Sequence, residues 1–216
     1  MKNLFITFEG IDGAGKDTQL HKLAEYIRDD DWKVLGDKYA HLWIIREPSL
    51  LTEPGRQIAS LIRQRDVSAK EAADLYIADR KEHTKLIKET LKHSFVLCSR
   101  YDLSTLSYQM TQGMEFEELY TMHDFDKEEG CLKPDLTIVF ELPVEIALQR
   151  TATRNSQKEC FEKEDFQKAL AEKQQYCIQK LQEKGRTTIV VNANQSMEEV
   201  TKEMLNKIKE IFPTGT

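Results

Sequence analysis

The chain has 216 residues, of which 40% are hydrophobic and 31% charged, so it can bury a sizeable core and is not expected to be disordered. Its formal net charge of −6 argues against a broad nucleic-acid-binding surface, although it allows a local basic pocket. No apolar run approaches the roughly 20 residues that cross a membrane, and the N-terminus has no signal-peptide pattern. We therefore expect one cytoplasmic domain over residues 1–216 that binds neither nucleic acid nor a membrane.

The first chemical motif follows an apolar stretch at residues 4–8, whose composition favours a strand. Residues 10–16, GIDGAGK, fit the pattern G-x-x-x-x-G-K, and a helical pattern begins directly afterwards. Such a loop surrounds a polyphosphate with backbone N–H groups, and its lysine adds a positive charge. A glycine-rich turn that binds nothing is the alternative, and the strand and helix on either side argue against it. The residues expected to contact the polyphosphate are Gly10, Ile11, Asp12, Gly13, Ala14, Gly15, Lys16, Asp17 and Thr18.

Strands and helices then alternate along the chain. Hydrophobic spacing predicts helices over residues 16–29, 55–64, 69–92, 102–124 with a break at Gly113, 143 to about 150–154, 164–184 and 196–211. Short apolar runs predict a strand within residues 32–47, split between Val34-Leu35 and Leu42 to Ile45, and further strands at 95–98, 136–140 and 187–191. Residues 155–163 are polar without a period and predict a loop. This alternation favours an α/β fold with a five-stranded parallel sheet and helices on both faces.

Two arginines follow predicted strands. Arg46 begins the sequence Arg46-Glu47-Pro48, and Arg100 follows Ser99. The carboxyl ends of parallel strands meet at the edge where ligands bind, so both side chains can converge on one crevice. A guanidinium suits bidentate phosphate binding. The alternative for each is a surface ion pair, for example between Arg46 and Glu47.

Tyr76 and Arg80 are four residues apart on one predicted helix, so they share a face. An aromatic ring can stack on a nucleotide base, and an arginine can donate to a carbonyl oxygen at the edge of that base. For Tyr76 alone, an ordinary core position is the alternative.

The order and spacing of these segments resemble the thymidylate kinases, P-loop kinases that transfer a phosphoryl group from ATP to dTMP. The matching segments are FEGIDGAGK at 8–16, REP at 46–48, LYIADR at 75–80, SRYDLSTLSYQ at 99–109, LKPDLTIVFELPVEIALQR at 132–150 and a basic lid at 150–163. The resemblance implies a P-loop kinase fold with a short lid, production of dTDP for dTTP synthesis, Mg²⁺ as cofactor and a homodimer. Transfer between two anionic nucleotides also needs positive charge on both sides of the reacting phosphate.

The resemblance also implies roles for individual residues. Lys16 and the loop hold ATP, and Arg100 is catalytic and binds the dTMP phosphate with Arg46. Tyr76 stacks on thymine and Arg80 reaches O4 of the base. The carboxylate of Asp12 holds the 3′-hydroxyl. The positions that surround the base and sugar are Ser104, Thr105, Tyr108 and Gln109, although Thr105 and Tyr108 would also suit ordinary helix packing.

Position 13 is a glycine, whereas one branch of the family has a catalytic arginine there and the other branch supplies that charge from the lid. The resemblance to the second branch makes Arg150 and Arg154 the expected catalytic cations, followed by Lys158. The lid is poorer in arginine than is usual for that branch. For Arg150, the alternative is a charge that complements the dipole at a helix C-terminus.

Two departures concern the metal. The loop position that usually carries a magnesium-binding hydroxyl is Asp17, and the aspartate of the family pattern Asp-Arg-Tyr is Ser99. We hypothesise that these residues have exchanged roles, so that one carboxylate and one hydroxyl still lie beside the metal. The alternative is a degraded metal site, with Thr18 or nothing compensating.

Two other functions are compatible with the sequence. One is a kinase for another nucleotide such as dUMP, which differs from dTMP by a methyl group worth at most about 1–3 kcal/mol of discrimination. The other is a nucleotide-binding homologue without kinase activity, which only the changes at Asp17 and Ser99 support.

Overall fold

We describe the protein from a computed structural model over residues 3–28, 41–64, 67–152 and 164–212. One five-stranded parallel sheet has the order β2-β3-β1-β4-β5, which confirms the predicted α/β fold. Its strands are β1 (Phe5–Glu9), β2 (His41–Arg46), β3 (Ser94–Ser99), β4 (Leu136–Glu141) and β5 (Thr188–Asn192). Within the described ranges, no helix is long and apolar enough to span a bilayer.

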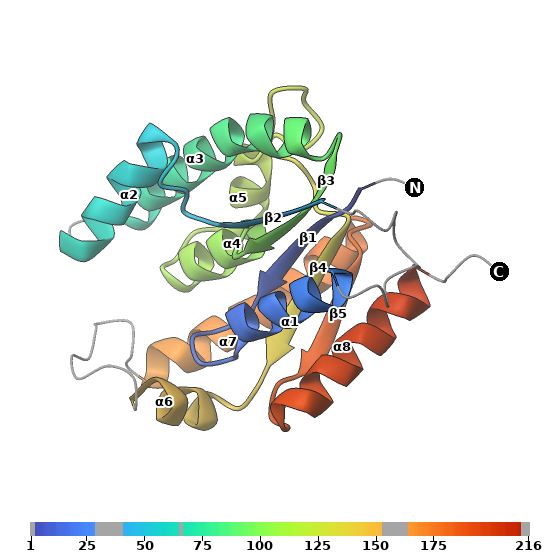
Figure 1. Ribbon diagram of the computed structural model, residues 1–216. Coiled ribbons are helices and arrows are strands. Elements are labelled where there is room, and N and C mark those ends of the chain that lie inside the picture. The colour runs from blue at the N-terminus through green and yellow to red at the C-terminus, as the bar shows by residue number, and fades with distance from the viewer. Residues whose placement is uncertain (1–2, 29–40, 65–66, 153–163, 213–216) are drawn as a thin grey trace.

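Helices cover both faces of this sheet (Figure 1). They are α1 (Lys16–Arg28), α2 (Glu53–Gln64), α3 (Ala69–Thr90), α4 (Asp102–Thr111), α5 (Phe116–Met122), α6 (Val144–Ala152), α7 (Glu164–Glu183) and α8 (Met197–Ile211). The predicted break at Gly113 separates α4 from α5, because this glycine takes a φ of 99° that other residues rarely adopt. The part of the second strand that was predicted at residues 34–35, and the predicted loop at 155–163, lie outside the described residues.

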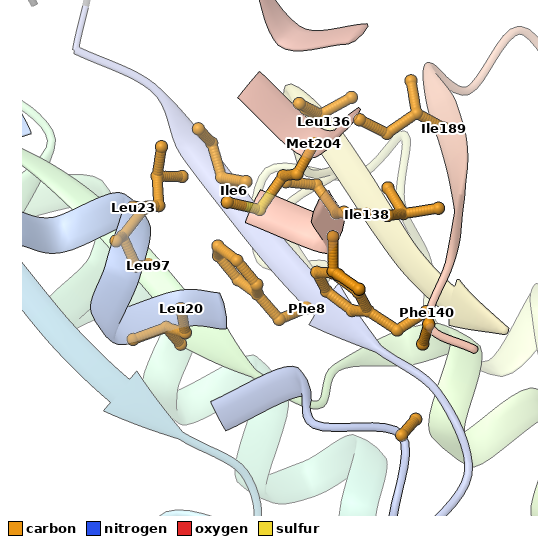
Figure 2. Packing of buried hydrophobic residues seen from close by; sticks show 14 of the residues in the cluster. Ile6, Phe8, Leu20, Leu23, Leu97, Leu136, Ile138, Phe140, Ile189 and Met204 are labelled. Carbon is orange, nitrogen blue, oxygen red and sulfur yellow. The ribbon is translucent and has the colours of Figure 1, made fainter. Parts of the chain in front are cut away.

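Burial of both faces of the sheet explains why the central strands are continuous apolar runs. Ile6 and Phe8 of β1 belong to a cluster with Leu20 and Leu23 of α1, whereas Phe5 points into a different cluster with residues of β2, β3 and α3. Figure 2 shows Phe8 beside Phe140 of β4, and the two rings stack with their centroids 6.1 Å apart. Successive side chains of a strand point to opposite faces, so burial of both faces produces a continuous apolar run.

The register of the strands determines which residues meet at one edge of the sheet. Phe8 of β1 and Arg46 of β2 both pair with Ser99 of β3. The three strands therefore end side by side, and the segments that follow them leave the sheet at one edge. The P-loop, Glu47 and Arg100 consequently emerge next to one another.

A buried ion pair anchors the start of α4 below this edge. Arg186, which precedes β5, donates from Nη1 to Oδ2 of Asp102 at 2.7 Å, and both side chains are at most 3% exposed. Burial by itself would raise the pKa of Asp102, but the charge and hydrogen bond of Arg186 lower it below the ordinary value. This contact joins residues 84 positions apart, so it ties the start of α4 to the segment between α7 and β5.

We expect Asp102→Ala to lower the free energy of unfolding by about 3–5 kcal/mol, because Arg186 would keep a buried charge without its partner. The lowered pKa of Asp102 gives a second signature. The stabilisation is fully present above the ordinary aspartate pKa of about 3.9 and is lost as the pH falls through the lower folded-state value. Urea unfolding at neutral and acidic pH measures both effects.

The matched control for this experiment is Glu25→Ala. Glu25 pairs with Lys22 at 3.0 Å on the exposed side of α1, where 50% of the Glu25 side chain is exposed. This change should cost less than about 1 kcal/mol. Equal losses in Asp102→Ala and Glu25→Ala would contradict the assigned role of the buried pair.

Candidate nucleotide-binding site

A cavity of about 530 Å³ opens at the carboxyl edge of the sheet, between the P-loop, α3, α4 and α7. It is lined by most of the residues that the sequence predicts for the site, which come from elements far apart in the chain. These residues are Asp12, Gly13, Gly15, Lys16, Asp17, Thr18, Arg46, Tyr76, Arg80, Arg100, Ser104, Thr105, Tyr108 and Gln109. Its polar and apolar walls are suited to a ligand that carries both phosphate and a flat base.

The P-loop follows the end of β4 and the first turns of α6 closely. A Cβ atom on Gly10 would lie 2.6 Å from the carbonyl oxygen of Phe140, and one on Gly13 would lie 2.6 Å from that of Ala147. Gly10 and Gly13 also have positive φ values of 147° and 88°. Ile11 and Ala14, which were predicted to contact the polyphosphate, are only 4% and 3% exposed and belong to the core. These two residues can therefore offer only backbone groups to a ligand.

Lys16 is the buried cation of the loop, with a relative exposure of 6%. Its Nζ lies 3.4 Å from Oδ1 of Asp12. Burial and the nearby positive charge of Arg100 lower the pKa of Lys16 to about 8. For Asp12, burial would raise the pKa, but Arg100 and Lys16 together lower it below its usual value. Lys16 and Arg100 thus place two positive charges beside the single carboxylate of Asp12. This excess of positive charge suits a site for phosphate.

Arg100 has a left-handed backbone with a φ of 64°, which directs it away from β3 into the cavity. Its Nη2 donates to Oδ1 of Asp12 at 2.5 Å, and its Nη1 donates to Oγ of Ser104 at 3.1 Å. The buried Glu9 accepts from the Ser104 hydroxyl at 2.6 Å and from the backbone N–H of Tyr101 at 2.7 Å. Burial raises the pKa of Glu9, although these hydrogen bonds oppose the change. Glu9 therefore fixes the turn on which Arg100 is placed.

Glu47 pairs with Arg80 and not with its neighbour Arg46. Its carboxylate pairs with Arg80 at 2.7 Å and approaches Nδ1 of His83 at 3.3 Å, and it is 2% exposed. The ion pair with Arg46 that the sequence left open is not formed, and Arg46 is exposed on the cavity wall. Arg46 is thus placed to receive an anion from solution.

Arg80 is more deeply buried than its predicted role suggests, at 1% exposure. Its guanidinium contacts Glu47, His123 and Thr105 and still borders the cavity. Tyr76, one turn earlier on α3, also borders the cavity, and burial raises its pKa to about 12, so its phenol stays neutral. The prediction that Tyr76 and Arg80 share a face toward one site agrees with this arrangement.

Asp17 and Ser99 touch across the start of α1 and the end of β3. The Ser99 hydroxyl donates to Oδ1 of Asp17, and Asp17 lines the cavity beside Thr18. Carboxylate and hydroxyl oxygens are suitable ligands for Mg²⁺, which binds nucleotides with few protein ligands and several waters. Among the described residues, no cluster of three or more His, Cys, Asp or Glu side chains could hold a metal by itself. The carboxylate of Asp17 and the hydroxyl of Ser99 offer oxygen donors of the kind that suits Mg²⁺.

The family model for thymidylate kinases matches residues 8–204 of this chain. The chain belongs to the thymidylate kinase family. Among its relatives, a probable thymidylate kinase of Methanocaldococcus jannaschii is 34% identical, with 97% of each chain covered. Probable thymidylate kinases of Pyrococcus abyssi and Methanococcus maripaludis are 33% and 34% identical, with 97% and 98% of each chain covered.

Of the lid cations that the thymidylate kinase resemblance implied, the structure describes only Arg150. Arg150 donates to the carbonyl oxygen of Ala193 at 3.2 Å and to that of Gly13 at 3.4 Å. It therefore ties the end of α6 to the P-loop backbone and to the end of β5, and it is not among the residues that line the cavity. Arg154 and Lys158 lie outside the described residues.

Several residues in or beneath the cavity of this thymidylate kinase were not predicted from the sequence. Gln167 of α7 lines the cavity at 5% exposure, although its helix shows only a charged amphipathic pattern. Glu9 binds Ser104, which in turn binds Arg100. Glu47 and His123 bind Arg80. A carboxylate directly after an apolar strand is the one signal that could have identified Glu9.

Proposed function

We propose that this protein is an ATP-dependent dTMP kinase that converts ATP and dTMP into ADP and dTDP. The observation that carries this proposal is one cavity that contains both the buried P-loop lysine, Lys16, and a second cluster of positive charge around Arg46 and Arg100. Two anionic substrates can therefore meet in one crevice. The names of the relatives, probable thymidylate kinases, support dTMP as the acceptor.

In the proposed reaction, the P-loop amides and Lys16 stabilise charge on the donor phosphates. Arg46 and Arg100 orient the acceptor phosphate. Asp12 binds Arg100 and Lys16 through Oδ1, so its other carboxylate oxygen can accept from the 3′-hydroxyl of the sugar. Positioning and electrostatic stabilisation supply the rate enhancement, so no strong general base is required. The family resemblance implies a lid with Arg154 as its cation, which would exclude water and limit hydrolysis of ATP, although Arg154 lies outside the described residues.

We propose that Asp17 and Ser99 would hold the Mg²⁺ ion with exchanged roles. A bound Mg²⁺ neutralises charge on the donor phosphates. The contact between the two side chains supports the exchange, because either residue could take either position beside the same ion.

The exchange predicts the outcome of a double-mutant cycle. Asp17→Ser leaves two hydroxyls and Ser99→Asp leaves two carboxylates, so each should lower kcat about 10- to 100-fold. Asp17→Ser, which removes the carboxylate, should also raise the Mg²⁺ concentration needed for half-maximal rate. The double variant restores one carboxylate and one hydroxyl and should recover most of the activity. Losses that simply add in the double variant would rule the exchange out, and a large loss in Thr18→Val alone would point to Thr18 as the compensating ligand.

An assay of ADP formation with dTMP, dUMP, dCMP, dGMP and no acceptor tests the proposed function. We expect strong stimulation by dTMP and weaker stimulation by dUMP, because the base differs by one methyl group. Preference for dUMP would assign a different nucleotide kinase. No stimulation by any acceptor, with ATP still bound, would indicate a non-catalytic nucleotide-binding protein.

We also propose that the protein is cytoplasmic, forms one domain over residues 1–216 and is a homodimer, as the family resemblance implies. Sedimentation equilibrium at micromolar concentration tests the dimer, which has twice the chain mass of 25.1 kDa.

A further inference from the structure

We propose that His123 is a positioning residue for the acceptor base, because its neutral ring holds the guanidinium of Arg80 as a fixed hydrogen-bond donor at the cavity wall. This inference rests on the proposed function and adds a residue to it. His123 itself does not line the cavity; it is fully buried at the end of α5, behind Arg80.

The contacts of the ring determine its tautomer. Nδ1 lies 2.7 Å from the carbonyl oxygen of Leu119, and a carbonyl oxygen can only accept a hydrogen bond. Nε2 lies 2.8 Å from Nη1 of Arg80, and a guanidinium can only donate. The proton of the neutral ring is therefore on Nδ1, and Nε2 is the acceptor for Arg80.

The surroundings of the ring favour this neutral state. Burial and the positive charge of Arg80 lower the pKa of His123 to about 3. Asp102 acts in the opposite direction and Arg186 in the same direction, and neither reverses the result. Phe125 stacks on the ring at a centroid distance of 4.9 Å and carries the Arg186 guanidinium 5.3 Å from its own centroid. The ring is thus held in one orientation.

Arg80 has few donors left for a ligand. Its Nε donates to Glu47 at 2.8 Å, and its Nη2 lies 2.7 Å from Glu47 and donates to Thr105 at 3.1 Å. With Nη1 also bound to His123, hydrogen bonds use the Nε–H and one N–H on each of Nη1 and Nη2, so one N–H is left on each terminal nitrogen. Because the guanidinium is planar, these partners also fix the directions of the two remaining N–H groups.

An N–H of Arg80 that is held in one direction can discriminate between bases by the group that they present to it. Thymine and uracil present a carbonyl oxygen at C4, whereas cytosine presents an amino group there. An amino group facing a rigid N–H leaves two donors opposed, and a buried site of this kind rejects the mismatched ligand strongly. If His123 were lost, the planar guanidinium would lose one of the partners that fix its orientation, so the whole group could tilt and the discrimination would weaken.

The test compares two substitutions of His123. His123→Phe keeps the stacking surface for Phe125 but removes the acceptor, and it should raise KM for dTMP about 10-fold and lower the dTMP-to-dCMP ratio of kcat/KM by a similar factor. KM for ATP should not change. His123→Gln places an amide oxygen near the position of Nε2 and should restore both values to within about 3-fold of the unsubstituted protein.

Leu119→Ala is the matched control. Leu119 is fully buried in the same helix, so its truncation destabilises the protein without removing the backbone carbonyl that binds His123. The dTMP-to-dCMP ratio should stay constant in this variant. An equal change of the ratio in Leu119→Ala and His123→Phe would reduce His123 to a structural residue and overturn the proposal.

Nitrogen-15 NMR of the His123 ring gives a readout that does not depend on activity or on whether the variants fold. We expect a protonated Nδ1 and a bare Nε2 from about pH 5.5 to pH 8. An Nε2–H tautomer, or protonation of both nitrogens in this range, would overturn the proposal. If the unsubstituted protein does not phosphorylate dTMP while the expected tautomer is found, the proposed function fails and the contact between His123 and Arg80 stands.

Discussion

Replacing Lys16 with methionine is expected to lower kcat about 10³-fold, the size of effect seen when a preorganised group that stabilises transition-state charge is removed. Lys16 is the only full positive charge within the P-loop at residues 10–16, and its Nζ is held by Asp12 in the cavity. Methionine keeps the length and apolar stem of the side chain, so the fold should persist. Steady-state kinetics and a urea melt of the same variant separate loss of catalysis from loss of stability.

The lowered pKa of Lys16 adds a pH signature. Burial and Arg100 bring this pKa down to about 8, and only the ammonium form attracts phosphate. The kcat/KM for ATP should therefore fall as the pH rises through about 8, because the free enzyme loses this charge. Burial alone would lower the pKa of Arg100, but Tyr108 and Asp12 raise it above its ordinary value, so Arg100 keeps its charge in this range and binding of dTMP should be less affected. A flat profile for ATP up to about pH 9.5 would contradict the assigned environment of Lys16.

Loss of Arg100 should have the second large effect. Arg100→Ala is expected to lower kcat/KM for dTMP by about 10²- to 10³-fold, because Arg100 is held in place by Asp12 and Ser104 before the substrate arrives. Arg46→Ala should cost less, since Arg46 is exposed and must be ordered on binding. Initial rates at varied dTMP and saturating ATP measure both.

Two further measurements distinguish a role of Arg100 in the site from a nonspecific effect of removing an arginine on the structure. Arg56→Ala removes an exposed arginine that pairs with Glu53 at 2.7 Å outside the cavity, and it should leave kinetics unchanged. Arg100 also contributes to the lowered pKa of Lys16, so Arg100→Ala should move the alkaline limb of the ATP profile to higher pH. An unshifted limb with normal dTMP kinetics would show that Arg100 does not act in this site.

The local patterns of the sequence predicted the P-loop and the order of strands and helices. Residues 10–16 identified the P-loop because its glycines and Lys16 are contiguous, and strands buried on both faces, such as residues 136–140, were visible as apolar runs. The placement of Arg46 and Arg100 at one edge followed from the rule for parallel strands, and the register of β2 and β3 agrees with it.

The interactions beneath the cavity could not be predicted in the same way. Arg80 binds Glu47 and His123, which are 33 and 43 positions away in the sequence, and no periodic pattern encodes such pairs. Arg150 lies at a helix end that resembled a lid, yet it contacts Gly13 and Ala193 because α6 packs against the P-loop. These contacts depend on how the elements pack, which single-sequence patterns do not determine.

The most direct test of the central claim is to follow the reaction of Mg-ATP with dTMP by phosphorus-31 NMR. Phosphoryl transfer within one cavity predicts equal amounts of ADP and dTDP, with little inorganic phosphate. Formation of ADP and inorganic phosphate at a rate independent of dTMP would contradict the claim, because the cavity would then activate ATP without presenting an acceptor to it.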